Sequence, residues 1–154
     1  MLYNDINLFK TFLISNKRII GLDVGSKKIG IAISDLSKTI SNPYSLMIRT
    51  NIKNDLEKIN SIIKDEYCGF VIGLPKMMNG EEGEACVVIR KFANFILEKF
   101  KLPIYLQDER LSTSAALRAL SESNYTRKRK NLMDDKISAS LILQNTLDHI
   151  NMIS

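Results

Sequence analysis

The chain has 154 residues, of which 45% are hydrophobic and 25% are charged. These are ordinary globular values, and they exclude a fibrous protein or one that is disordered throughout. No apolar run approaches membrane-spanning length, and Cys68 and Cys86 lack the spacing of a zinc site or of a disulfide framework. We therefore expect a cytoplasmic protein with no membrane partner. The net charge of +5 favours nucleic acid as a partner, although many basic proteins bind none.

The first part of the chain predicts three short strands. Residues 1–17 precede the first strong strand signal, so we set them apart as an N-terminal extension and expect a single domain over residues 18–150. The strands are predicted at Arg18–Leu22, Ile29–Ser34 and Ser45–Thr50. Because the turns that separate them are short, we expect an antiparallel meander.

Helices and strands then alternate, which requires parallel pairing. The predicted elements are a helix from Ile52 to Ile63, a strand at Gly69–Leu74, a helix from Glu84 to Phe100, a strand at Pro103–Gln107, a helix from Ser112 to Glu122, a basic loop from Asn124 to Lys130 and a final helix containing Ile137 and Leu141. In the helix from Glu84, the side chains expected to face inward are those of Ala85, Val88, Phe92, and Phe95 or Ile96. The fold class is therefore α/β, with a mixed five-stranded sheet, three antiparallel strands followed by parallel strands, flanked by helices.

Asp23 is the first candidate site residue. It lies at the carboxyl end of the first predicted strand, where a sheet with parallel neighbours presents ligands and catalytic groups. Gly21, Gly25 and Gly30 surround it, and their lack of a Cβ would let a phosphate or another backbone approach. An Asp beside a glycine can equally stabilise a turn, so both interpretations stay open for Asp23 alone.

Further acids occur at two later places in the chain. Asp108 and Glu109 end the fifth predicted strand, and alternation along a strand implies that only one of them faces the site, without showing which. Asp134 and Asp135 are expected to open the final helix, where the helix dipole alone favours acids. Asp135 is the third candidate ligand because it starts the amphipathic stretch. Three carboxylates would repel one another unless cations shared the site, and oxygen ligands suit Mg²⁺ or Mn²⁺.

Two such ions can activate water and stabilise the leaving oxygen of a phosphodiester, so the predicted reaction is hydrolysis. The candidate phosphate-binding side chains are those of Lys27, Lys28, Arg110, Arg127, Lys128, Arg129 and Lys130. The candidate phosphate-binding loop residues are Gly25, Gly73, Pro75, Asn79 and Gly80. A solvated basic loop and a long surface loop are the alternatives for these two sets. His149 is expected at the surface.

Four segments together resemble the YqgF/RuvX family over roughly residues 18–148. Arg18–Asp35, with the sequence RIIGLDVGSKKIGIAISD, is similar to the opening of that family. The further similar segments are Gly73–Pro75 with Asn79 and Gly80, Asp108–Thr113 (DERLST), and Asp135 followed by Ala139 and Leu141–Gln144. Each piece is weak alone, and the combination in this order is specific.

The resemblance implies a ribonuclease H-like fold, a cytoplasmic location and maturation of the 5′ end of precursor 16S ribosomal RNA. It implies that Asp23 is the first-strand acid, that Asp108 or Glu109 is the acid after the later strand, and that Asp135 is the acid of the final helix. Lys28 stands where the family often has Arg, which keeps the charge but loses the bidentate fork. RNA and ribosome precursors are therefore favoured over DNA as partners.

Three alternatives remain from sequence. A Holliday junction resolvase would use the same carboxylates on branched DNA and would need a homodimer, whereas an RNA-processing enzyme could act as a monomer. A non-catalytic nucleic-acid-binding or ribosome-assembly factor could keep the fold without cleaving. An actin-like sugar kinase shares the Asp-x-Gly turn, but it needs a second comparable domain that 154 residues do not provide.

Overall fold

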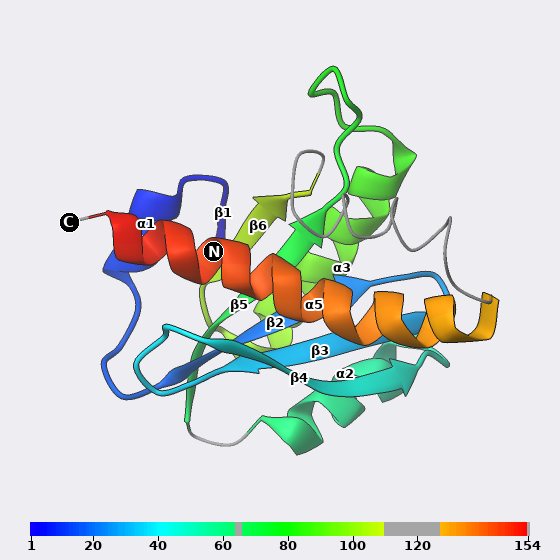
Figure 1. Ribbon diagram of the computed structural model, residues 1–154, viewed down its shortest axis with the longest axis horizontal. Helices are drawn as coiled ribbons and strands as arrows, with labels where there is room; N and C mark the ends of the chain where they lie inside the picture. The colour runs from blue at the N-terminus through cyan, green and yellow to red at the C-terminus, as the bar shows by residue number, and fades with distance from the viewer. Residues whose placement is uncertain (64–65, 110–126, 154) are drawn as a thin grey trace.

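The computed structural model describes residues 1–63, 66–109 and 127–153, and within residues 127–136 it describes the backbone alone. These residues form a six-stranded sheet in the order β1-β6-β5-β2-β3-β4 (Figure 1). The strands are β1 (Leu2–Tyr3), β2 (Arg18–Val24), β3 (Lys28–Ser34), β4 (Ser41–Ile48), β5 (Tyr67–Leu74) and β6 (Ile104–Asp108). The pairs β2·β3 and β3·β4 are antiparallel, whereas β2·β5, β5·β6 and β1·β6 are parallel. The predicted mixed sheet, antiparallel first and parallel later, is confirmed.

The strand count of five was wrong, because the segment set apart as an extension contributes to the sheet. Leu2 and Tyr3 of β1 pair with Ile104 and Tyr105 of β6. The chain then forms α1 (Ile6–Thr11), whose Phe9 is fully buried and lies 5.5 Å from the Tyr105 ring, centroid to centroid. A two-residue strand has no periodicity for a sequence pattern to detect.

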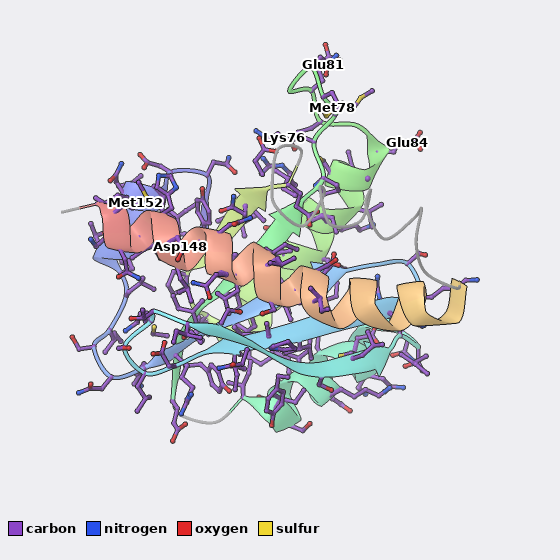
Figure 2. All side chains as sticks on the ribbon, in the orientation of Figure 1. Lys76, Met78, Glu81, Glu84, Asp148 and Met152 are labelled. Carbon is purple, nitrogen blue, oxygen red and sulfur yellow. The ribbon has the colours of Figure 1, made fainter. Side chains whose placement is uncertain are left out.

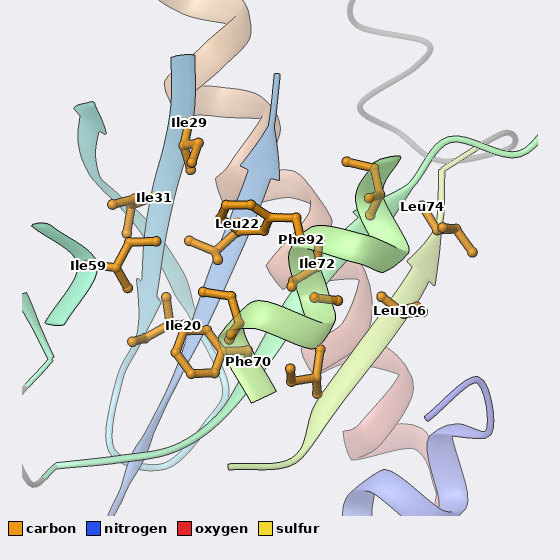
Figure 3. Close-up of a cluster of buried hydrophobic side chains, with 14 of the residues drawn as sticks. Ile20, Leu22, Ile29, Ile31, Ile59, Phe70, Ile72, Leu74, Phe92 and Leu106 are labelled. Carbon is orange, nitrogen blue, oxygen red and sulfur yellow. The ribbon is translucent and has the colours of Figure 1, made fainter. Parts of the chain in front are cut away.

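Two hydrophobic clusters cover the two faces of the sheet. On one face, α2 (Ile52–Ile62) and α3 (Glu84–Phe100) pack against Ile20, Leu22 and their neighbours on β3, β5 and β6 (Figure 3). On the other face, α1 and α5 (Arg127–Met152) pack against Ile19 and the alternate residues of the other strands, and Figure 1 shows α5 lying across this face. Residues of β2 alternate between the faces, so Ile19, Gly21 and Asp23 belong to the α5 side.

Helix α5 begins earlier than the sequence predicted. It starts at Arg127, so the expected basic loop was wrong for residues 127–130, and Asp134 and Asp135 lie inside the helix rather than at its opening. Lys and Arg are good helix formers, and this stretch has no Gly or Pro to interrupt it. The expected helix from Ser112 to Glu122 falls outside the described residues.

Two smaller expectations also differ from the structure. In α3, Phe92 and Ile96 are buried as predicted, whereas Ala85 and Val88 are exposed, because the rest of the buried stripe is formed by Cys86, Ile89 and Ala93. Strand β4 begins at Ser41 rather than Ser45, and it includes Pro43 beside a shift in register. Proline is tolerated there because β4 is an edge strand. No helix in the described part of the chain is long and apolar enough to cross a membrane.

Candidate active site

Asp23 lies near the carboxyl end of β2, a central strand held between β3 and β5. It pairs with Gly30 of β3. Two residues earlier, a Cβ on Gly21 would lie only 2.7 Å from Cβ of Leu143 and 3.2 Å from the carbonyl oxygen of Ala139. Glycine at this position therefore lets α5 approach β2 closely, just before Asp23.

The turn after β2 is fixed by backbone contacts. The amide of Gly25 donates to the carbonyl of Lys28 at 2.9 Å, and the amide of Arg49 donates to the carbonyl of Lys27 at 2.8 Å. A Cβ on Gly25 would lie 2.9 Å from the Lys28 carbonyl oxygen, so the turn requires glycine. Lys27 is exposed and Lys28 is half-buried, so two cations stand at the end of the turn that follows Asp23.

Glu109 reaches the same edge from β6. Its amide donates to the carbonyl of Leu74 at 3.1 Å, which holds the chain against the end of β5 after β6 has finished. Only 8% of Glu109 is exposed. A Cβ on Gly73 would lie 2.7 Å from Cδ and 2.8 Å from Oε1 of Glu109. The carboxylate of Glu109 therefore occupies the space that a side chain at position 73 would fill.

Asp23 and Glu109 line one cavity of about 290 Å³. Among the described residues, those that line it are Asp23, Val24, Gly25, Gly73, Pro75, Ile89 and Glu109. Two acids thus come together from the ends of β2 and β6, with β5 between them. The same cavity includes three of the five predicted loop residues, Gly25, Gly73 and Pro75.

Asp108, the alternative to Glu109, does not line this cavity. It is the last residue of β6 and is in register with Leu74 of β5. Along β6, Ile104 and Leu106 belong to the cluster under α2 and α3, so alternation assigns Asp108 to that face and not to the Asp23 face. Burial of the Tyr105 ring, and secondly the charge of Asp108, raise the pKa of the Tyr105 phenol.

The loop after β5 separates the remaining two loop candidates from the cavity. The amide of Gly80 donates to the carbonyl of Met77 at 2.8 Å, with Gly80 at a φ of 89°, and the side-chain oxygen of Asn79 accepts from the amide of Glu81 at 3.0 Å. Figure 2 shows Met78 and Glu81 at the projecting end of this loop. Asn79 and Gly80 therefore shape the loop, and they lie outside the cavity lining.

For the other predicted site residues, the structure describes either the backbone alone or nothing. Arg127, Lys128, Arg129 and Lys130 form the first turn of α5. Asp135 lies in α5 one helical turn before Ala139, and its side chain is outside the described residues, as is Arg110. Among the side chains of residues 1–63, 66–109 and 137–153, no three His, Cys, Asp or Glu residues form a group that could hold a metal ion. His149 is exposed, as predicted.

Arg49 and Ile89 were not among the site residues predicted from the sequence. Ile89 lines the cavity from α3, and Arg49 Nη1 donates to the carbonyl of Gly25 at 2.9 Å. The helical spacing of apolar residues in α3 could have indicated Ile89. No local pattern signals Arg49, because its contact spans 24 residues.

The chain is similar to known proteins over nearly its whole length. Residues 17–149 match a family model described as "RuvX: Holliday junction resolvase". A relative from Anaplasma marginale is 44% identical over 96% of this chain and 95% of its own length, and one from the Wolbachia of Brugia malayi is 46% identical over 99% of both. Both carry the name "Putative pre-16S rRNA nuclease". Among solved structures, Thermus thermophilus RuvC with a Holliday junction substrate matches 87% of this chain and 96% of its own, at 9% identity and a TM-score of 0.48.

Proposed function

Because the chain belongs to the RuvX family, we propose that it is a metal-dependent nuclease that hydrolyses phosphodiester bonds at the cavity between Asp23 and Glu109. One observation carries the assignment of the site. Two acids from separate strands line the same cavity, and Gly73 leaves the space that the second acid occupies. A fold that needed these residues only for stability would have no reason to bring two like charges to one opening.

The donor set fits a hard divalent cation. Two carboxylates supply oxygen ligands of the kind that Mg²⁺ and Mn²⁺ prefer, and a cation between them would relieve their repulsion. Asp23 and Glu109 would hold the ion, and we add Asp135 as a third ligand. When bound, such ions lower the pKa of a coordinated water and stabilise negative charge on the leaving oxygen.

The backbone of α5 supports the choice of Asp135. Ala139 and Leu143 of α5 lie against Gly21, which belongs to the same face of β2 as Asp23. From Gly21, Asp23 is two strand residues further, roughly 6–7 Å. Asp135 precedes Ala139 by four helical residues, about 6 Å along the helix axis. In Figure 1 the first half of α5 extends over the end of β2, so both displacements run toward the same edge.

The residues around the cavity suit a phosphate backbone. Lys27 and Lys28 lie four and five residues after Asp23 and would neutralise phosphates on either side of the cleaved bond. The first turn of α5, at the end of the helix that contains Asp135, consists of four cationic residues.

We propose precursor 16S ribosomal RNA, cleaved at its 5′ end in the cytoplasm, as the substrate. The names of the relatives support RNA processing. The description of the family model supports a second candidate, cleavage of branched DNA, which would need two sites in a homodimer. Both candidates use the same carboxylates, so substrate and solution mass distinguish them.

The test is a cleavage assay with Mg²⁺ or Mn²⁺ on precursor 16S RNA, a four-way DNA junction and single-stranded RNA. It compares the wild type with Asp23→Asn and with Asp35→Asn, a matched change of an acid outside the cavity. We expect Asp23→Asn to lower kcat by more than about 100-fold, because even outer partners of metal ligands contribute 10–100-fold. Asp35→Asn should cleave normally.

Three outcomes would change the proposal. Cleavage by Asp23→Asn at the wild-type rate would overturn the site. Cleavage of the junction alone, by a dimer, would replace precursor RNA with branched DNA as the substrate. A wild type that binds RNA but cleaves nothing with either metal would overturn the enzyme in favour of an assembly factor.

A further inference from the structure

Arg49 lies between β4 and α2 and holds both ends of the turn that follows Asp23. Its side-chain Nη1 donates to the carbonyl of Gly25 at 2.9 Å, and its backbone amide donates to the carbonyl of Lys27 at 2.8 Å. Arg49 is absent from the lining of the cavity. It therefore contacts the turn without lining the cavity that holds the two acids.

Asp55, in the first turn of α2, fixes the direction of the Arg49 side chain. The Asp55 residue is fully buried, and its Oδ2 accepts from Arg49 Nε at 3.2 Å while its Oδ1 accepts from the Thr50 amide at 3.0 Å. A buried carboxylate is costly unless it is paired and hydrogen-bonded. The pair is consequently hard to separate, and Arg49 cannot turn away without leaving Asp55 uncompensated.

Phe92 of α3 completes the support for Arg49. The guanidinium carbon lies 5.2 Å from the centre of the Phe92 ring, which is the geometry of a cation–π contact. Phe92 is itself buried in the cluster beside Leu22 of β2 (Figure 3). Arg49 thus contacts both α2 and α3, the two helices that pack against this face of the sheet.

We propose that Arg49, oriented by Asp55, is a positioning residue that sets the place of Asp23 through the carbonyl of Gly25, an inference that rests on the proposed nuclease site. The guanidinium fork lets Nε meet Asp55 while Nη1 meets Gly25. A lysine ammonium would keep the charge but could not make both contacts in this fixed geometry. Asp23 is only two residues from Gly25, so a shift of the turn moves the carboxylate as well.

Arg18 at the other end of β2 provides a matched control. Its Nε lies 3.6 Å from Oε2 of Glu66, and its Nη1 donates to the carbonyl of Ser34 at 3.1 Å. Like Arg49, it joins a carboxylate to a backbone carbonyl beside the same strand. Arg18→Lys therefore repeats the chemical change at the end of β2 away from Asp23.

The experiment compares Arg49→Lys, Arg18→Lys and wild type in cleavage, in Mn²⁺ titration without substrate, and in thermal unfolding. We expect Arg49→Lys to lose about 10–100-fold in kcat and in Mn²⁺ affinity, the usual cost of losing a residue that orients a metal ligand. Its KM should change little. Arg18→Lys should match the wild type in kcat and Mn²⁺ affinity. Equal losses in the two variants would overturn the proposal, and so would a rise in KM with unchanged kcat, because that would make Arg49 a substrate contact.

A measurement independent of catalysis separates this inference from the proposed function. Hydrogen exchange of the Gly25 amide, which is bonded to the Lys28 carbonyl, should accelerate in Arg49→Lys and not in Arg18→Lys. A wild type that neither cleaves nor binds Mn²⁺ would end the proposed function. Unchanged exchange at Gly25 in Arg49→Lys would end the positioning role, whatever the activity.

Discussion

Asp23 and Asp35 occur at the ends of two neighbouring antiparallel strands, yet their surroundings differ. Asp35 follows β3, and the turn that begins there supplies hydrogen-bond donors to its carboxylate. Oδ1 accepts from the amides of Thr39 and Ile40 at 2.7 and 3.0 Å, and Oδ2 accepts from the Ser37 hydroxyl at 2.6 Å. These hydrogen bonds, led by that of Ser37, lower the pKa of Asp35 to about 2. Asp23 instead lines a cavity that it shares with Glu109.

The difference shows what distinguishes a turn acid from a site acid. The chain after Asp35 folds back, and the Ser37 hydroxyl and the amides of Thr39 and Ile40 donate to its carboxylate. The residue two after Asp23 is Gly25, whose backbone bonds are made to Lys28 and Arg49. The neighbouring strand ends then contribute Gly73 and Glu109. Convergence of several strand ends, more than the residue type, makes Asp23 the candidate catalytic acid.

The largest difference between a site acid and its neighbour is expected for the adjacent residues Asp108 and Glu109. Glu109→Gln should lower kcat by more than about 100-fold, since it removes a proposed metal ligand. Asp108→Asn should leave kcat near the wild-type value because Asp108 does not line the cavity. Single-turnover cleavage with saturating Mn²⁺ measures both. The reverse result would assign the site to Asp108 and contradict the cavity geometry.

A smaller effect is expected from the glycine that makes room for Glu109. Gly73→Ala adds a Cβ that would lie 2.7 Å from Glu109 Cδ and 2.8 Å from Cδ1 of Ile142. We expect a loss of about 1–3 kcal/mol in the free energy of unfolding, as for other overpacked cores. The displaced carboxylate should also lower kcat by about 10–100-fold.

Gly69→Ala in the same strand is the control for that substitution. Its Cβ would lie 3.2 Å from the carbonyl oxygen of Pro103 and 3.3 Å from the Phe9 ring, far from both acids. It should reduce the stability measured by urea unfolding while kcat stays unchanged. Similar kcat values in Gly73→Ala and the wild type would show that the role of Glu109 in cleavage does not depend on the space that the missing Cβ of Gly73 leaves.

The sequence predicted the elements whose signals are local. Ile19–Leu22 of β2 and Cys68–Leu74 of β5 are continuous apolar runs that are buried, and the predicted helix from Glu84 to Phe100 matches α3 at both ends. β1 was not predicted, because its two residues form a strand by pairing with β6, about 100 positions away in the chain. The start of α5 was misplaced because a basic run is compatible with both loop and helix.

The candidate site was predictable in its residue types and only partly in its arrangement. Alternation showed that Asp108 and Glu109 point to opposite sides, but the choice between them depends on Gly73 in another strand. Arg49 gave no signal, because its contact with Gly25 spans 24 residues, and Asp55 gave none, because it matters only through Arg49. Asp135 remains a prediction for its side chain, and the structure supplies only its position in α5.

The smallest expected effect returns to Asp35. Its folded-state pKa is depressed from the ordinary 3.8 to about 2, so its contribution to stability is present above about pH 4 and is lost as the pH falls through 2. The turn is open to solvent, and we expect Asp35→Asn to cost about 1 kcal/mol at pH 7, discounted for screening. The gap between mutant and wild type should narrow between pH 4 and pH 2 in urea unfolding, with kcat at pH 7 unaffected. A gap that stayed constant over that range would mean that ionisation of Asp35 does not stabilise the fold, and a loss of kcat would mean that the two aspartates are coupled through β3.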